Sequence, residues 1–166
     1  MGKKIVFDIM SPKSVARASA ELRAYAAWVE QKEAELRVRL ASLGATVASI
    51  RFSRAIYSGT NDVSVRVDDT GDVATIYAEG ESVAFIEFGT GAAHGYGHPL
   101  AGEHGFGPGT WSDGPDGKGH WDDPNGWWYA HGQHTYGNPP AAAMVAARDA
   151  MVEELTTIAR EVFGTA

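Results

Sequence analysis

The run Val83-Ala84-Phe85-Ile86-Glu87-Phe88-Gly89-Thr90-Gly91 places a single acid within an apolar segment that ends at a glycine-rich turn. Burying a carboxylate among apolar side chains is costly unless the group is paired or hydrogen-bonded. Two interpretations of Glu87 follow. It either lies at the end of an element, where it bonds backbone N–H groups or an arginine, or it holds a contact between subunits.

Segment 83–88 is too short for its periodicity to distinguish a strand from a short helix. Before it, valines alternate with polar residues over Val63–Val67, and a second extended stretch covers Val73–Ala78. The sequence Asp68–Asp72 predicts a turn between these stretches. Together they predict an antiparallel hairpin with one buried face, whose register is fixed by the turn. A further short strand is predicted over Lys4–Asp8.

The N-terminal part of the chain predicts a long amphipathic helix. Apolar residues recur at helical spacing over Val15–Leu43. Ser11 and Pro12 supply the cap and a first-turn proline. Gly44 is expected to end or kink this helix, and a second helical piece is predicted over Ala45–Ile56.

The last helix is predicted to start at Pro140, with Asn138 as its cap, and to end after Phe163. The predicted fold class is therefore α+β: a small, mainly antiparallel sheet covered by long N- and C-terminal amphipathic helices, with a long glycine- and aromatic-rich loop. At 166 residues the chain fits a single domain, 1–166, in which 89–137 is an extended loop or assembly arm.

Composition excludes several classes of protein. Cysteine is absent, which rules out a disulfide scaffold and cysteine nucleophiles and suits a reducing cytoplasm or a virion assembled there. No stretch approaches the roughly 20 apolar residues of a membrane-spanning helix, so no membrane association is expected. The net charge of −7 disfavours a protein that grips nucleic acid, because phosphate contacts use clustered lysine and arginine. If the protein instead formed a ring around passing DNA, the acidic wall of the ring would repel the phosphates and let the duplex slide.

The segment Gly89–Gly137 holds 14 of the 20 glycines, all six histidines and four of the five tryptophans. Long loops without structure of their own are usually functional or disordered, and this one is too aromatic for ordinary disorder. We expect it to order against a neighbouring subunit as an assembly arm, with a flap over its own sheet as the alternative. Aromatic anchors carry much of the energy of protein interfaces. The interface candidates here and in the apolar run are Phe85, Ile86, Glu87, Phe88, Gly89, Trp111, Trp127, Trp128, Tyr129 and Tyr136.

Catalytic chemistry finds little support in the residues. His94 and His98, and likewise His131 and His134, have spacings that suit a metal site only if a helix fixes them, and the glycines and proline around the first pair prevent one. There is no Gly-x-Ser-x-Gly nucleophile elbow and no P-loop. We predict no catalytic residue, no cofactor and no metal. A metal-dependent hydrolase that uses the histidine-rich segment is the alternative from another class.

Four motifs lie in a characteristic order between the first and last predicted helices. They are Ile86–Gly91, Gly105–Trp111, Trp127–Tyr129 and Thr135–Pro140. From about Arg37 to Phe163 the chain resembles the small neck, or tail-completion, proteins of long-tailed bacteriophages, which are head-to-tail connectors and tail components. This resemblance favours a helix, or a helical turn, over 83–88.

The resemblance implies a structural virion protein that is not an enzyme. Copies would form a ring at the neck that joins the head connector to the tail and surrounds the DNA channel. Its partners would be further copies of itself, the connector or stopper, and the tail terminator or tail tube, while DNA passes without sequence-specific binding. The protein would be found in the virion, and in the host cytoplasm during assembly. A tail terminator that caps the tail tube is the alternative within this class.

Overall fold

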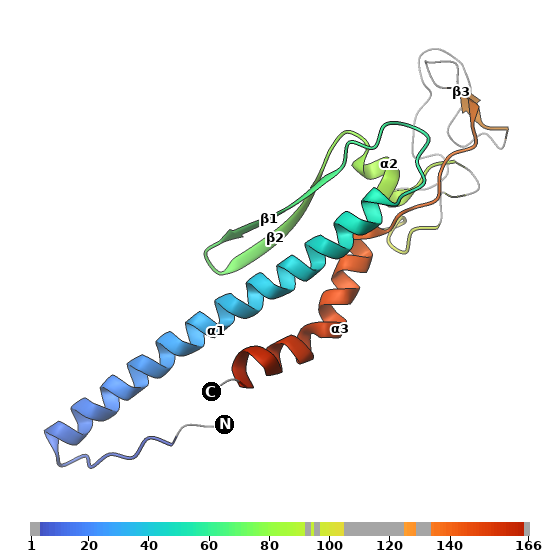
Figure 1. Ribbon diagram of the computed structural model, residues 1–166. Helices are drawn as coiled ribbons and strands as arrows, with labels where there is room; N and C mark the ends of the chain where they lie inside the picture. Colours follow the sequence, from blue (N-terminus) through green and yellow to red (C-terminus); the bar gives the residue numbers. More distant parts are fainter. Residues whose placement is uncertain (1–3, 92–93, 95–96, 105–124, 129–133, 165–166) are drawn as a thin grey trace.

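The computed structural model describes residues 4–91, 94, 97–104, 125–128 and 134–164. Its elements are α1 (Pro12–Ser53), β1 (Ser64–Thr70), β2 (Val73–Glu79), α2 (Val83–Phe88), β3 (Trp127–Trp128), β4 (His134–Thr135) and α3 (Ala143–Gly164). Figure 1 shows α1 as the long axis, with the β1–β2 hairpin and α3 lying along its C-terminal part. The α+β fold class predicted from the sequence is therefore confirmed.

Helix α1 is one continuous element of 42 residues, which at 1.5 Å per residue is about 63 Å long. Its first turn is capped as predicted, because the Ser11 side chain accepts a hydrogen bond from the Ser14 N–H. The predicted end or kink at Gly44 is wrong. A Cβ at position 44 would lie 2.6 Å from Ile76 Cδ1 and 2.7 Å from Met151 Sδ. Gly44 therefore marks the place where β2 and α3 both approach α1 closely.

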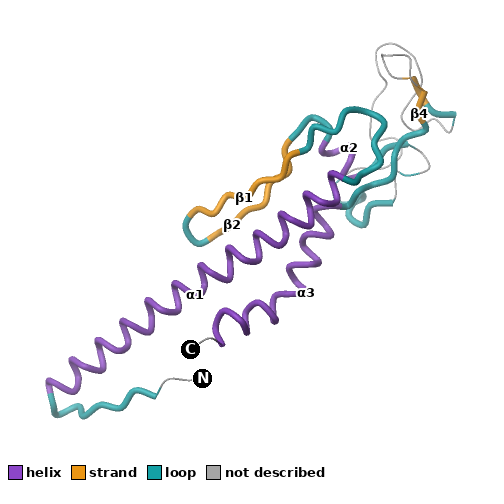
Figure 2. Tube along the Cα trace, in the orientation of Figure 1, coloured by secondary structure: helices purple, strands orange, loops and turns teal. Residues whose placement is uncertain are grey.

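The predicted hairpin is confirmed, with a tighter turn than expected. β1 and β2 pair antiparallel from Ser64 opposite Glu79 to Thr70 opposite Val73, which leaves only Gly71 and Asp72 in the turn. Gly71 has φ +65°, a left-handed conformation that glycine adopts without a steric cost. The tube in Figure 2 shows the hairpin beside α1, with both strands extending from α2 to the turn.

Helix α3 covers α1 from the other side and runs antiparallel to it (Figure 1). An ion pair joins Arg39 to Glu161, and the Trp28 ring meets the Phe163 ring edge-on at 6.0 Å between centroids. The most buried cluster lies where the three helices meet, and its members are Ala48, Phe52, Ile86, Ala143 and Ala147. Most of these side chains are small, so the helices pack closely around a thin core.

Two further expectations are corrected. The predicted strand Lys4–Asp8 is not a strand: among the described residues it has no pairing partner, and Val6 and Phe7 are exposed. A strand needs a neighbour for its backbone hydrogen bonds, whatever its side chains favour. The last helix starts at Ala143 rather than at Pro140, and Asn138 does not cap it. Among the described residues, no helix is both long and apolar enough to cross a membrane.

The loop between α1 and the hairpin caps two helix ends. Asn61 Nδ2 donates to the Phe52 carbonyl at the end of α1, over 2.8 Å. Asp62 accepts hydrogen bonds from the Ser82 hydroxyl and from the N–H groups of Glu81 and Ser82, just before α2. These bonds, the one from the Ser82 side chain above all, lower the pKa of Asp62 from 3.8 to about 2.

We expect the variant Asp62→Asn to be less stable than the wild type at neutral pH. The carboxylate is favoured in the folded state, so its contribution is fully present above pH 3.8 and is lost as the pH falls towards 2. The difference in the free energy of unfolding between the wild type and Asp62→Asn should therefore shrink as the pH falls through this range. Urea unfolding at a series of pH values measures it, with Asp72→Asn at the exposed turn as the control. A difference that is independent of pH would contradict the assigned role of Asp62.

Candidate functional site

The site is built around Glu87 at the end of α2. This side chain is only 5% exposed. Its carboxylate accepts a hydrogen bond from the Ala143 N–H over 2.7 Å, and the Met144 N–H lies 3.1 and 3.2 Å from its two oxygens. The first N–H groups of a helix lack partners within the helix and carry the positive end of its dipole. Glu87 thus caps α3 from a distant part of the sequence, which confirms the interpretation that it bonds backbone N–H groups.

His98 completes the environment of Glu87. Its Nε2 lies 3.1 Å from Glu87 Oε1, while its Nδ1 accepts a hydrogen bond from the Leu100 N–H over 3.0 Å. Because Nδ1 is an acceptor, the hydrogen of the neutral ring is on Nε2, which donates to the carboxylate. The ring is 1% exposed and packs on Phe88, with 4.4 Å between the ring centroids. The spacing of His98 from His94 in the sequence suited a metal site only if a helix fixed it, and did not identify Glu87 as the partner of His98.

The chain before α3 in turn satisfies the end of α2. The N–H groups of Ala141 and Ala142 donate to the carbonyls of Ile86 and Glu87, over 2.8 and 3.1 Å. Asn138 Nδ2 donates to the Phe85 carbonyl over 3.1 Å. The last carbonyls of one helix and the first N–H groups of another are therefore satisfied by the same pair of segments. We call these segments, 83–91 and 137–144, the clasp.

A backbone bridge locks the clasp. Thr90 and Asn138 exchange backbone hydrogen bonds of 2.9 and 3.1 Å, and the Thr90 hydroxyl donates to Asn138 Oδ1 over 2.6 Å. Gly137 has φ +97°, and a Cβ there would lie 2.1 Å from the Thr90 carbonyl oxygen. Only glycine allows these two segments of the chain to approach each other this closely. Asn138, the expected helix cap, serves this bridge instead.

The interface candidates from the sequence have different locations. Ile86, Glu87 and Gly89 are buried within the chain, as parts of the clasp, while Phe85 and Phe88 are partly buried. Tyr136 is 64% exposed. The backbone of Trp127 and Trp128 forms β3, which pairs with β4. Trp111 and Tyr129 lie outside the described residues, as does most of the predicted assembly arm, so its role stays a prediction.

An open, largely apolar pocket of about 360 Å³ lies beside the clasp. Phe88, His98, Leu100, Met144 and Arg148 are among the residues that line it. Among the described residues, no group of three or more histidine and acidic side chains could hold a metal ion. Because both Glu87 oxygens already accept hydrogen bonds, this buried carboxylate is engaged in structure and is poorly placed to serve as a general base.

Comparison of this chain with protein-family models, with curated proteins and with solved structures finds no match in any of the three.

Proposed function

We propose that the protein is a non-enzymatic structural component of a bacteriophage neck. Copies form a ring that joins the head connector to the tail and surrounds the DNA channel. The proposal starts from the resemblance of the sequence motifs to neck and tail-completion proteins. Two of those motifs, Ile86–Gly91 and Thr135–Pro140, contribute residues to the clasp, among them Thr90 and Asn138 of its bridge. A role for these motifs in building a rigid subunit agrees with a structural protein.

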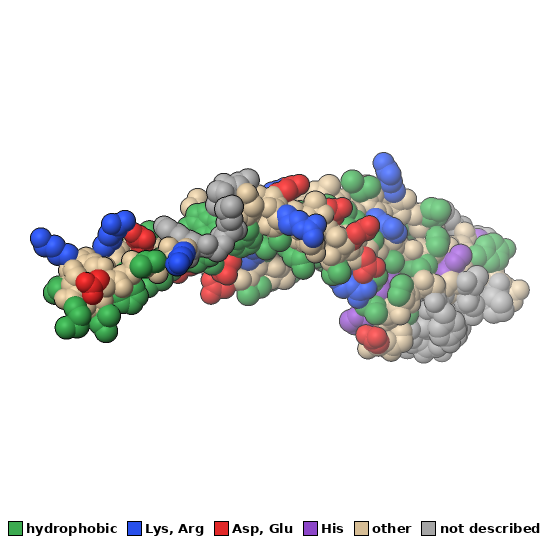
Figure 3. Space-filling view, turned by 90° about the horizontal axis from the view of Figure 1, so that it is seen from below, with side chains coloured by type: hydrophobic (Ala, Val, Ile, Leu, Met, Phe, Trp, Pro, Cys, Tyr) green, Lys and Arg blue, Asp and Glu red, His purple; other side chains and the backbone are tan. Residues whose placement is uncertain are grey.

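The observation that carries the proposal is the distribution of apolar side chains. In the described part of the chain, the larger buried aliphatic and aromatic residues are few, and alanines make up most of the core. Large apolar side chains are exposed instead along the hairpin and both long helices, among them Val15, Leu22, Tyr25, Val152 and Leu155. Figure 3 shows apolar side chains gathered at the N-terminal end of α1. Surfaces of this kind mark sites of protein association.

The shape and charge of the chain also support this role. α1 extends well beyond α3 and the hairpin (Figure 1), so its first turns are free to contact another subunit. The net charge of −7 suits a channel wall that does not hold DNA. No group in the clasp is arranged as a catalytic base next to a nucleophile. Association therefore explains more of the described surface than catalysis does.

Removal of the gene from the phage should give heads and tails that fail to join, or joined particles that lose their DNA. Electron microscopy of lysates, with complementation by the wild-type gene as the control, measures this. The physical reason is that a ring between two rotationally symmetric parts cannot be bypassed if neither part binds the other directly. Normal, infectious particles in the absence of the protein would contradict the proposed function.

A further inference from the structure

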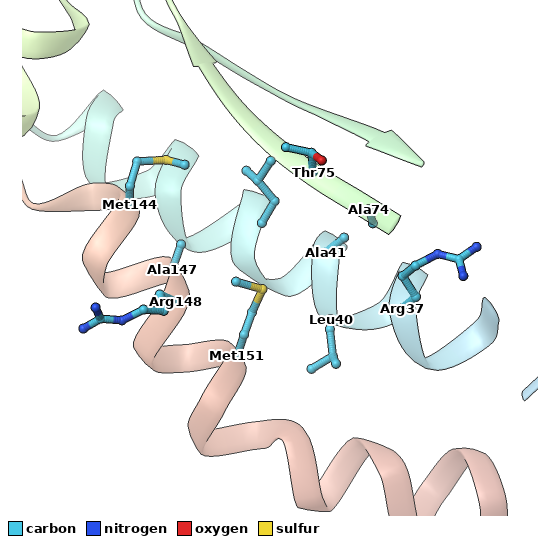
Figure 4. A pocket seen from close by; sticks show the side chains of 10 residues that line it. Arg37, Leu40, Ala41, Ala74, Thr75, Met144, Ala147, Arg148 and Met151 are labelled. Carbon is cyan, nitrogen blue, oxygen red and sulfur yellow. The ribbon is translucent and has the colours of Figure 1, made fainter. Parts of the chain in front are cut away.

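An open groove runs along β2, between the hairpin and α3. Its volume is about 450 Å³. α1 forms the floor and β2 and α3 form the walls, as Figure 4 shows. The lining is largely apolar and consists of Arg37, Leu40, Ala41, Ala74, Thr75, Ile76, Met144, Ala147, Arg148 and Met151.

The edge of β2 beside this groove has free backbone groups. Pairs in an antiparallel ladder alternate between hydrogen-bonded and non-hydrogen-bonded, and the pair next to the two-residue turn, Thr70 with Val73, is hydrogen-bonded. The N–H and C=O groups of Ala74, Ile76 and Ala78 therefore point away from β1. Within the part of the chain that the structure describes, no backbone hydrogen bond reaches them. Such an edge is a template for an added strand.

The same chain carries a strand-forming segment that belongs to no sheet. Residues Lys4–Phe7 are strand-forming by composition, and no backbone hydrogen bond reaches them among the described residues, whereas Asp8 already bonds Met10, Ser11 and Ser14 at the start of α1. Val6 is 77% exposed and Phe7 is 53% exposed. A lone strand gains its hydrogen bonds and buries its side chains only when a sheet edge accepts it. The molecule thus holds both a strand-forming segment outside any sheet and an open sheet edge.

The segment cannot reach the groove of its own chain. Along α1, Pro12 lies about 38 Å from Arg37, the nearest floor residue, at 1.5 Å per residue. Even fully extended, the chain from Ser11 back to Lys4 spans at most about 25 Å. The groove can therefore accept this segment only from another copy.

Charge favours one orientation. Arg37 lies at the turn end of β2, where it pairs with Asp69 opposite Ala74, and Glu79 lies at the other end of β2, where it pairs with Arg66. An antiparallel segment brings Asp8 to the Arg37 end and Lys4 to the Glu79 end. A parallel segment would bring Lys4 to Arg37 instead. Opposite charges across neighbouring strands are favourable and like charges are not.

We propose that residues Lys4–Phe7 of one copy add as an antiparallel third strand to the β2 edge of a second copy, with apolar side chains in the groove. The inference rests on the self-association contained in the proposed function. Each copy then donates a strand at one end and accepts one at the other. A head-to-tail contact of this kind closes into a ring when its rotation permits.

Disulfide cross-linking tests the contact, because the chain has no cysteine of its own. Val6→Cys protein is mixed with mass-tagged Thr75→Cys protein under oxidising conditions, and heterodimers are measured by mass. We expect efficient cross-linking of this pair. The control partner is Asp68→Cys, which lies opposite Thr75 on β1. Position 68 is one strand further from the added strand than position 75, so its Cα would lie about 10 Å from that strand. A disulfide needs Cα atoms within about 7 Å of each other.

A backbone variant tests the same edge without cysteine. Ala74→Pro removes an outward N–H from β2, whereas Val67→Pro removes one from the outer edge of β1. We expect Ala74→Pro to weaken self-association at least about tenfold, and Val67→Pro to have a much smaller effect. Circular dichroism melts of both variants show whether each is folded at the temperature of the measurement.

Absence of the Val6–Thr75 cross-link, or a stronger one to Asp68, overturns the strand addition. Sedimentation of the wild-type chain distinguishes failure of the strand addition from failure of the proposed function. Oligomers that persist without the cross-link would remove only the strand addition, and the neck role would stand. A chain that is monomeric both alone and with its neck neighbours would remove both.

Discussion

Glu87→Ala should destabilise the protein by about 2 to 4 kcal/mol, because it leaves several buried donors without an acceptor at roughly 1–3 kcal/mol each. The donors are the N–H groups of Ala143 and Met144 and the Nε2–H of His98. The start of α3 would also lose the negative charge that opposes its dipole. Chemical denaturation monitored by circular dichroism measures the loss.

Two variants make this test specific. Glu87→Gln keeps the shape of the side chain and one acceptor oxygen, so its loss should be smaller than that of Glu87→Ala. Glu81→Ala removes an exposed acid just before α2 and should change stability by less than about 0.5 kcal/mol. If Glu87→Ala unfolds at the same denaturant concentration as Glu81→Ala, Glu87 does not cap α3.

Gly137→Ala should cost at least about 3 kcal/mol, because it combines a strained backbone with a clash that no side-chain movement relieves. The added Cβ would lie 2.1 Å from the Thr90 carbonyl oxygen, and φ at this position is +97°. The bridge between Thr90 and Asn138 must then open. Hydrogen exchange of the Thr90 and Asn138 amides reports the bridge directly, alongside the free energy of unfolding.

Gly71→Ala is the matched control for Gly137→Ala. Gly71 also has a positive φ, +65°, but no atom lies within 4 Å of an added Cβ. This variant should therefore carry only the backbone cost, about 1 to 2 kcal/mol. Equal losses from the two substitutions would show that the close approach in the clasp contributes nothing to stability.

Glu87→Ala and Gly137→Ala bear on the proposed function because both residues belong to the clasp. The clasp fixes the start of α3, and α3 in turn forms one wall of the groove along β2. A loosened clasp should therefore weaken self-association as well as folding. Sedimentation without denaturant, at a temperature well below the unfolding transition, measures self-association of the folded variants and so separates this effect from the loss of stability.

The sequence by itself determined the elements that depend on near neighbours in the chain. Helical spacing of apolar residues predicted α1 and α3, and alternation with a glycine-containing turn predicted the β1–β2 hairpin. The apolar surroundings of Glu87 also predicted that its carboxylate is hydrogen-bonded. These inferences succeed because periodicity and the cost of burying a charge are properties of a local segment.

Only the tertiary structure decided what depends on residues far apart in the chain. Gly44 does not end α1, because the surrounding turns are stabilised by α3 and β2 packed against them. The partners of Glu87 are the start of α3 and the ring of His98, and Asn138 bonds Thr90 and Phe85 instead of capping a helix. Lys4–Asp8 forms no strand because a strand exists only where another backbone accepts its hydrogen bonds, and no local pattern can supply that backbone.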